Sequence, residues 1–370
     1  MAKWARVGVA ILALVTLVLP SGAAPAIPGL PAYYPTDYNR IIEASKAEGK
    51  LLIYSIMSAR NWAPVLAEFK KLYPWLEVET LDLGSYEVFE RYYAESASGA
   101  RTADLIISIA PDAWQEFVQK GQAAAYESPE SRFVPTWAKF GKEIYMVSAD
   151  PMVFIWNKRA LRRDLWPKGM AHLAELVQQN PQTFRNRLTT YDAERVATGF
   201  AINWFWIKRH GERGWRIQET LAGAGVKTQS SAGRMIDSVL SAESVVGYFV
   251  STISVFPRFP AAEPVLGWGM IDDGTPVANR GMAITRAARS PNAARLMLDF
   301  ILSQAGQLAF AEGGLTAYRA DLAGKAKYHL TDLAKAIGEK NLIVFSYDKD
   351  LMDKAKREAF LTRWKKIYQR

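Results

Sequence analysis

The chain contains no cysteine, and only three of its 370 residues are histidines. The absence of cysteine excludes disulfides, thiol chemistry and cysteine-based metal sites. It also excludes a lipid-modified cysteine at the start of a mature chain. His172, His210 and His329 are scattered, so they form no short metal-binding motif such as H-E-x-x-H. We therefore expect no metal site and no cofactor.

Recognisable catalytic motifs are also missing. The sequence has no G-x-S-x-G, no S-x-x-K and no P-loop lysine, and Gly223-Ala224-Gly225 is too little for a dinucleotide-binding fingerprint. We therefore expect no catalytic residues and a protein that is not an enzyme. An unrecognised secreted hydrolase is the alternative.

Long apolar runs are nearly absent. The exception is Val7 to Leu19, which follows Lys3 and Arg6 and is too short to span a membrane. The small residues Ala24-Pro25-Ala26 come next, an arrangement typical of a signal peptide. We place the signal peptide at residues 1–26 and expect a free, soluble protein in the periplasm. A retained N-terminal membrane anchor is the alternative.

The chain also lacks an excess of acidic residues. It has 46 Lys and Arg against 37 Asp and Glu, a formal net charge of +9. Few basic residues are adjacent, so we expect no nucleic-acid partner. The positive charge favours attraction of an anionic ligand, although solubility alone also accounts for it. With 49% hydrophobic and 22% charged residues, the composition is typical of a folded globular protein.

Apolar runs of strand length alternate with amphipathic helical segments in the first third of the chain. Residues 51–55, 76–83 and 103–108 are predicted strands, and helical patterns follow each of them. This order, with short connections, indicates an α/β fold in which a mainly parallel sheet is covered by helices on both faces. Ligands bind such sheets beyond the carboxyl ends of the strands.

Four blocks of sequence carry a resemblance to a known family. They begin with EGKLLIYS at residue 48, PMVFIWNKRAL at 151, GERGWRIQ at 211 and AITRAARSPNAARLMLDFILSQAGQ at 283. In this order and spacing they resemble the family 1 extracellular solute-binding proteins of ABC transporters. Members of that family bind ferric iron, phosphonates and phosphorylated sugars.

The resemblance implies a type II periplasmic binding protein fold. Two α/β lobes would be joined by crossing strands and would close on a ligand in the cleft between them. Lobe 1 would comprise residues 27–127 and 252–308, and lobe 2 would comprise 128–251 and 309–370. The implied partner is an ABC transporter permease in the inner membrane, and we expect a monomer.

The ligand must be inferred from the loops around the expected cleft. Iron-binding members of the family use a pair of adjacent tyrosines, where this chain has Ser251-Thr252. Neutral hydroxyls are poor ferric ligands but good donors to an anion. Tyr92-Tyr93 lies within a predicted helix, where neighbouring side chains point about 100° apart, and is expected to pack. We therefore expect an anionic ligand, with ferric iron as the alternative.

The candidate site residues are mostly hydroxyls at strand ends and helix starts. Backbone N–H groups at a helix start attract anions, and arginine offers paired hydrogen bonds to carboxylate or phosphate. Helix capping without any ligand is the alternative role for each hydroxyl. By the resemblance, Asp273 belongs to a turn that lines the cleft and can bind an amine or a hydroxyl. The candidates are Ser55, Ser58, Ser108, Thr190, Tyr191, Ser230, Ser231, Arg234, Ser251, Thr252 and Asp273.

The sequence thus predicts the periplasmic solute-binding component of an ABC importer. Its ligand is expected to be a small anionic organic solute, a class that includes phosphorylated and phosphonate compounds. Two alternatives share the fold, namely a ferric iron-binding protein of an ABC importer and a ligand-sensing subunit for a membrane sensor kinase.

Overall fold

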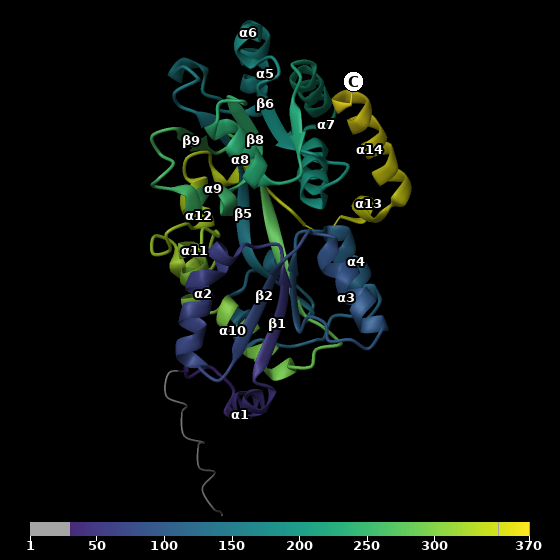
Figure 1. The fold of residues 1–370 in the computed structure, drawn as a ribbon, viewed down its shortest axis with the longest axis vertical. Coiled ribbons are helices and arrows are strands. Elements are labelled where there is room, and N and C mark those ends of the chain that lie inside the picture. The colour runs from purple at the N-terminus through teal and green to yellow at the C-terminus, as the bar shows by residue number, and fades with distance from the viewer. Residues whose placement is uncertain (1–29, 347, 370) are drawn as a thin grey trace, which may run out of the picture.

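The computed structural model describes residues 30–346 and 348–369 and has two lobes stacked along its long axis (Figure 1). Lobe 1, at the bottom of Figure 1, contains α1 (Asn39–Glu48), and lobe 2, at the top, contains α5 (Met170–Gln179). The predicted signal peptide, residues 1–26, lies outside the described residues. Within those residues, no helix has both the length and the apolar character needed to cross a membrane.

The strands of both lobes belong to one continuous path. Their bounds are β1 Lys50–Ser55, β2 Glu77–Asp82, β3 Leu105–Ser108, β4 Lys139–Phe140, β5 Ile144–Asn157, β6 Leu188–Tyr191, β7 Lys227–Gln229, β8 Val246–Ser251, β9 Leu266–Gly269, β10 Thr275–Ile284 and β11 Leu342–Val344. The order along the path is β2-β1-β3-β10-β5-β8-β6-β7, with β11 beside β10 and with β4 and β9 beside β5.

Each lobe contains a parallel sheet joined to an antiparallel strand. In lobe 1, β1 is parallel to β2 and β3, while β10 runs antiparallel to β3. In lobe 2, β6 is parallel to β7 and β8, while β5 runs antiparallel to β8. The predicted strands at 51–55, 76–83 and 103–108 correspond to β1, β2 and β3. The predicted α/β two-lobe fold is therefore confirmed.

Helices cover both faces of the sheets (Figure 1). Lobe 1 carries α1, α2 (Ala59–Leu72), α3 (Glu87–Ala97), α4 (Pro111–Gln119), α10 (Pro291–Leu302) and α11 (Gln304–Glu312). Lobe 2 carries α5, α6 (Pro181–Phe184), α7 (Ala197–Gly223), α8 (Ala232–Leu240), α9 (Thr252–Val255), α13 (Lys349–Met352) and α14 (Lys354–Tyr368). The short helix α12 (Leu330–Ala334) comes after α11 and before β11 in the chain.

Two long strands, β5 and β10, connect the lobes. Within lobe 1 the first half of β5 pairs with β10, and within lobe 2 its second half pairs with β8 and β9. Every residue of both strands is buried. Because only a few backbone segments cross between the lobes, the crossing strands can act as a hinge.

The two hydrophobic cores divide the chain differently from the predicted lobe boundaries. The lobe 1 core draws mainly on residues 38–149 and 282–330, and the lobe 2 core on 152–271 and 345–367. The predicted change of lobe at residue 128 comes too early, because the chain crosses only within β5. The predicted return at residue 252 also comes too early, because the chain crosses back in β10. The predicted assignment of 309–330 to lobe 2 is corrected because α11 packs against α2 of lobe 1.

The C-terminal helices lie along the side of lobe 2 and reach lobe 1 (Figure 1). Phe360 and Trp364 of α14 are buried in the lobe 2 core. At the start of the same helix, Arg357 Nη1 donates a hydrogen bond to Asp112 of α4 at 3.0 Å. The hydroxyl of Tyr86, just before α3, donates to the same carboxylate at 3.0 Å. The Arg357–Asp112 pair therefore ties lobe 2 to lobe 1.

Candidate ligand-binding site

An open cavity of about 890 Å³ lies between the two lobes. Its volume suits a small-molecule ligand. Lobe 1 contributes one wall and lobe 2 the other, with the crossing strand β10 between them. The lining residues fall within the segments 56–61, 82–87, 191–198, 230–233 and 251–258, together with Ile109 and Arg280.

The lobe 1 wall consists of strand ends and helix starts. Parallel pairing of β1 with β2 sets Ser55 beside Asp82, so both strands end at the same edge of the sheet. After β1 the chain turns into α2, whose first residues, Ala59 and Arg60, line the cavity. After β2 it turns into α3, whose first residue, Glu87, lines the cavity too. This wall therefore combines two helix N-termini with two carboxylates.

The lobe 2 wall contains the N-termini of α7 and α8. Ala197 and Thr198 begin α7, and Ser231 and Gly233 flank the first residue of α8. Ser231 Oγ accepts a hydrogen bond from the Arg234 backbone N–H at 3.3 Å and so caps α8. The remaining first N–H groups of a helix have no acceptor within the helix and carry a partial positive charge. They can donate to an anion in the cavity.

Arg280 of β10 places a buried cation between the walls. Its side chain is almost fully buried and also lines the cavity. Nη1 donates to Ser148 Oγ at 3.1 Å and to the carboxylate of Asp150. Nε has no hydrogen-bond partner among the described residues. Because a buried unpaired donor costs about 1–3 kcal/mol, an anion that accepts from Nε would stabilise the site.

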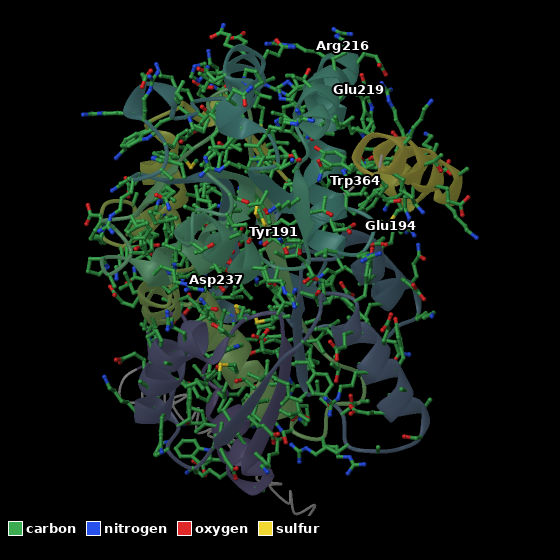
Figure 2. All side chains as sticks on the ribbon, turned by 45° about the horizontal axis from the view of Figure 1, so that its top comes forward. Tyr191, Glu194, Arg216, Glu219, Asp237 and Trp364 are labelled. Atoms are coloured by element: carbon green, nitrogen blue, oxygen red, sulfur yellow. The ribbon has the colours of Figure 1, made fainter. Side chains whose placement is uncertain are left out.

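Tyr191, at the end of β6, lies among several donors. Burial raises the pKa of its phenol, and the Arg280 guanidinium and the backbone N–H groups of Ala232 and Ser251 oppose that rise. Ser251 Oγ is buried without a partner among the described residues. Figure 2 shows Tyr191 near the middle of the molecule. We call Tyr191, the Ala232 N–H, Ser251 and Arg280 the hinge subsite.

Five of the predicted site residues line the cavity. Ser58 belongs to the lobe 1 wall, and the other four belong to the lobe 2 wall. Tyr191 and Ser251 carry the strongest signs of a ligand role, because they belong to the hinge subsite, whereas the Ser231 hydroxyl already caps α8. The five are Ser58, Tyr191, Ser230, Ser231 and Ser251.

Three predicted hydroxyls lie outside the lining because their bonds point elsewhere. Ser55 Oγ accepts from the Trp62 indole at 3.0 Å. Ser108 Oγ donates to the Ser85 carbonyl at 2.7 Å, and Thr190 Oγ1 donates to the Tyr248 carbonyl at 3.1 Å. These hydroxyls stabilise the strand ends and neighbouring loops rather than face the cavity.

The other three predicted residues are also outside the lining. Arg234 lies one residue beyond the lining residue Gly233, and its side chain is exposed. Thr252 is fully buried, and its hydroxyl has no partner within the described part of the chain. Asp273 accepts hydrogen bonds from the Met170 and Ala171 backbone N–H groups at 2.8 Å, so its carboxylate caps α5. In this structure Asp273 therefore acts as a helix cap, and its ligand role stays a prediction.

Several lining residues were missed by sequence reasoning. Arg280 lies in an apolar strand, and an arginine within a buried strand was a usable signal. Asp82 and Glu87 border β2 and α3, where the alternating pattern gave no sign of a cavity. Arg258 also lines the cavity and pairs with Asp237 at 3.3 Å.

We find no metal site built from acidic, histidine or cysteine side chains among the described residues. Across residues 30–346 and 348–369, no three such side chains come together in a way that could hold a metal ion. The cavity lining contains four arginines and two carboxylates. That charge balance favours an anion over a free cation.

Solved structures of low sequence identity share this fold. One is a substrate-binding protein of an ABC transporter from Agrobacterium tumefaciens, with 24% identity, a TM-score of 0.78, and coverage of 86% of this chain and 94% of that one. A second is AfuA from Actinobacillus pleuropneumoniae with fructose 6-phosphate bound, with 18% identity, a TM-score of 0.67, and coverage of 87% and 99%. A third is iron-bound HitA from Pseudomonas aeruginosa, with 15% identity, a TM-score of 0.58, and coverage of 70% and 83%.

A search of curated proteins finds no match to the chain. The sequence model of one family does match, and it covers residues 55–316. This range includes both walls of the cavity, the hinge subsite and both crossing strands. The chain belongs to the family of bacterial extracellular solute-binding proteins.

Proposed function

We propose that this protein is the periplasmic solute-binding component of an ABC importer and that it captures a small anionic organic solute between its lobes. Family membership supports the binding role, and the similar Agrobacterium structure is a substrate-binding protein of an ABC transporter. The expected partner is the permease of the importer in the inner membrane. The family is one of binding proteins, so we propose no catalytic activity.

The hinge subsite is the observation that carries the proposal. Tyr191, Ser251 and Arg280 line the same cavity and offer hydrogen-bond donors, and the Arg280 guanidinium and the N–H groups of Ala232 and Ser251 lower the pKa of the Tyr191 phenol. Arg280 Nε and Ser251 Oγ are buried without partners in the described structure. An oxyanion placed here would satisfy these donors and would also receive the positive end of the α8 dipole.

The position of the cavity supports capture by lobe closure. Both lobes contribute lining residues, so a ligand can bridge them. The crossing strands β5 and β10 provide the hinge, and the Arg357–Asp112 pair joins the lobes beside it. Ligand binding should therefore favour the closed arrangement over an open one.

A thermal-shift screen tests the proposed ligand class. The mature protein would be unfolded, stripped of bound solute, refolded and mixed with organic phosphates, phosphonates, carboxylates, polyamines, and ferric iron with citrate. A ligand at a hundred times its dissociation constant raises the free energy of unfolding by about 2.7 kcal/mol, a clear shift. We expect organic anions to produce this shift.

A shift with ferric iron alone would contradict the proposal and would favour the iron-binding alternative. A shift with polyamines alone would contradict the anionic ligand class. Transport and signalling would be separated by uptake of the identified anion in cells lacking the gene. Loss of uptake supports the importer, whereas normal uptake with a lost transcriptional response would favour the sensor subunit.

A further inference from the structure

Asp82 presents a carboxylate to the cavity with no partner from the protein. It ends β2 and belongs to the lobe 1 wall. Among the described residues, no hydrogen bond or ion pair reaches this carboxylate, and burial alone raises its pKa. The other lining carboxylate differs, because Glu87 Oε2 accepts a hydrogen bond from the Gly84 N–H at 2.9 Å. Asp82 is exposed to the open cavity, so its carboxylate is an acceptor that a ligand can reach.

The free carboxylate lies well apart from the hinge subsite. In the strand order, β1 and β3 separate β2 from β10, the strand of Arg280. Three strand spacings amount to about 14 Å between the backbones. Different parts of one ligand must therefore face Asp82 and Arg280. A cavity of about 890 Å³ leaves room for a ligand long enough to do so.

The two ends of the cavity suit opposite kinds of ligand group, hydrogen-bond acceptors at the hinge subsite and hydrogen-bond donors at Asp82. The hinge subsite offers donors only, apart from hydroxyl groups that can both donate and accept, whereas a carboxylate accepts hydrogen bonds only. A second anionic group beside Asp82 would be repelled, and an apolar group there would leave the carboxylate desolvated and unpaired. Arg60 lies on the same wall, yet no ion pair joins it to Asp82. A ligand hydroxyl or ammonium is the group that would pair with this carboxylate.

We propose that Asp82 determines specificity by accepting a hydrogen bond from a hydroxyl or ammonium group of the ligand, at the end opposite its anionic group. This inference rests on the proposed function and narrows it to bipolar solutes, such as hydroxylated or aminated organic anions. Asp82 thus accepts from one end of the solute while the hinge subsite binds the other. Lobe closure then brings both contacts into place at once.

Paired probes test the proposal on the full mature chain. Glycerol 1-phosphate is compared with propyl phosphate, and glycerate with propionate, by calorimetric titration. Phosphoethanolamine tells an ammonium donor from a hydroxyl. We expect the donor-bearing member of at least one pair to bind the wild type about tenfold more tightly, which corresponds to about 1.4 kcal/mol.

Two variants test whether Asp82 causes the preference for the donor-bearing ligand. In Asp82→Asn and Asp82→Ala the preference should fall to about twofold or less. The donor-bearing member should bind more weakly than to the wild type, and the apolar member should bind equally well or more tightly, because no carboxylate is left to be desolvated. The matched control is Glu79→Gln, which removes one negative charge from an exposed side chain of the same strand outside the lining. It should leave both affinities unchanged.

The outcomes separate this inference from the proposed function. Equal wild-type binding of the members of each pair would overturn the role of Asp82 while leaving anion capture intact. An equal loss of both members in the Asp82 variants would overturn it too, because the carboxylate would then act on the whole site. If no organic anion binds the wild type, the proposed function itself fails.

Discussion

The lobe 1 wall and the lobe 2 wall of the cavity are both built from strand ends and helix N-termini, but they present different charges. The lobe 2 wall carries Arg195 and Arg258 and no lining carboxylate, and the hinge adds Arg280 beside it. The lobe 1 wall carries Asp82 and Glu87 with one arginine, Arg60. We therefore propose that the shared α/β scaffold determines where a ligand binds, whereas a few side chains determine which end of the ligand faces which lobe.

The hinge and the lobe 2 wall also differ in how their charges are buried. Arg280 is almost fully buried and paired with Asp150, whereas the Arg195 side chain is 80% exposed and 3.9 Å from Asp192. Exposed pairs of this kind contribute little free energy, because water and salt screen them. A buried arginine with an unpaired Nε can contribute much more when an anion binds. We therefore assign the anion to the hinge side of lobe 2.

Replacing Arg280, the cation at the hinge, should have the largest effect of the changes proposed here. Arg280→Met leaves the Asp150 carboxylate buried without its cation, so the free energy of unfolding should fall by about 3–5 kcal/mol in urea titrations at pH 7. The double variant Arg280→Met/Asp150→Asn removes both charges and should recover most of this loss. An unchanged stability of Arg280→Met would show that the pair does not hold the hinge together.

Removing one unpartnered hydroxyl should weaken ligand binding by an intermediate amount. Ser251→Ala should lower the affinity for the anion identified in the screen by about tenfold, because one donor to the anion is lost. The melting temperature of the empty protein should stay nearly constant, since Ser251 Oγ has no partner in the described structure.

Thr190→Ala is the matched control for Ser251→Ala. Its hydroxyl bonds to the Tyr248 carbonyl and not to the cavity, so the variant should lose about 1 kcal/mol of stability and keep its affinity. The opposite pattern, a destabilised Ser251→Ala with unchanged affinity, would assign Ser251 a structural role.

Breaking the contact between the lobes should have the smallest effect. Arg357→Ala removes the pair with Asp112 and should weaken binding by no more than about fivefold, because a partly exposed pair contributes about 0–1 kcal/mol. Arg363→Ala on the same helix removes a pair with Glu212 inside lobe 2 and should leave affinity unchanged. Equal affinities of both variants and the wild type would show that α14 does not influence closure.

The sequence carried enough information for the fold and for part of the site. The blocks around residues 48, 151, 211 and 283 predicted the two-lobe fold because their order reflects the order of the strands and helices. Tyr191 was predicted because it precedes a helix start, and Ser251 because it stands where iron-binding members of the family have a tyrosine. Both line the cavity, and their ligand roles stay predictions. Thr190, next to Tyr191, lies outside the lining, since successive side chains of a strand point to opposite faces.

The remaining site residues depend on contacts between distant parts of the chain. Arg280 and Asp150 meet because two antiparallel crossing strands align them, and local sequence patterns do not reveal that register. Asp273 looked like a ligand residue because acidic turns line clefts in relatives, yet its carboxylate caps α5. The lobe boundaries seen in the structure differ from the predicted ones for another reason, because the chain crosses between the lobes inside strands and not in linkers.

A crystal structure of the protein with the tightest-binding anion from the screen tests the central claim most directly. We predict that the anionic group lies within about 3 Å of Tyr191 Oη, the Ala232 N–H or Arg280 Nε, with a hydroxyl or ammonium of the same ligand facing Asp82. An anionic group bound against Arg60 in lobe 1, with the hinge subsite empty, would contradict the account.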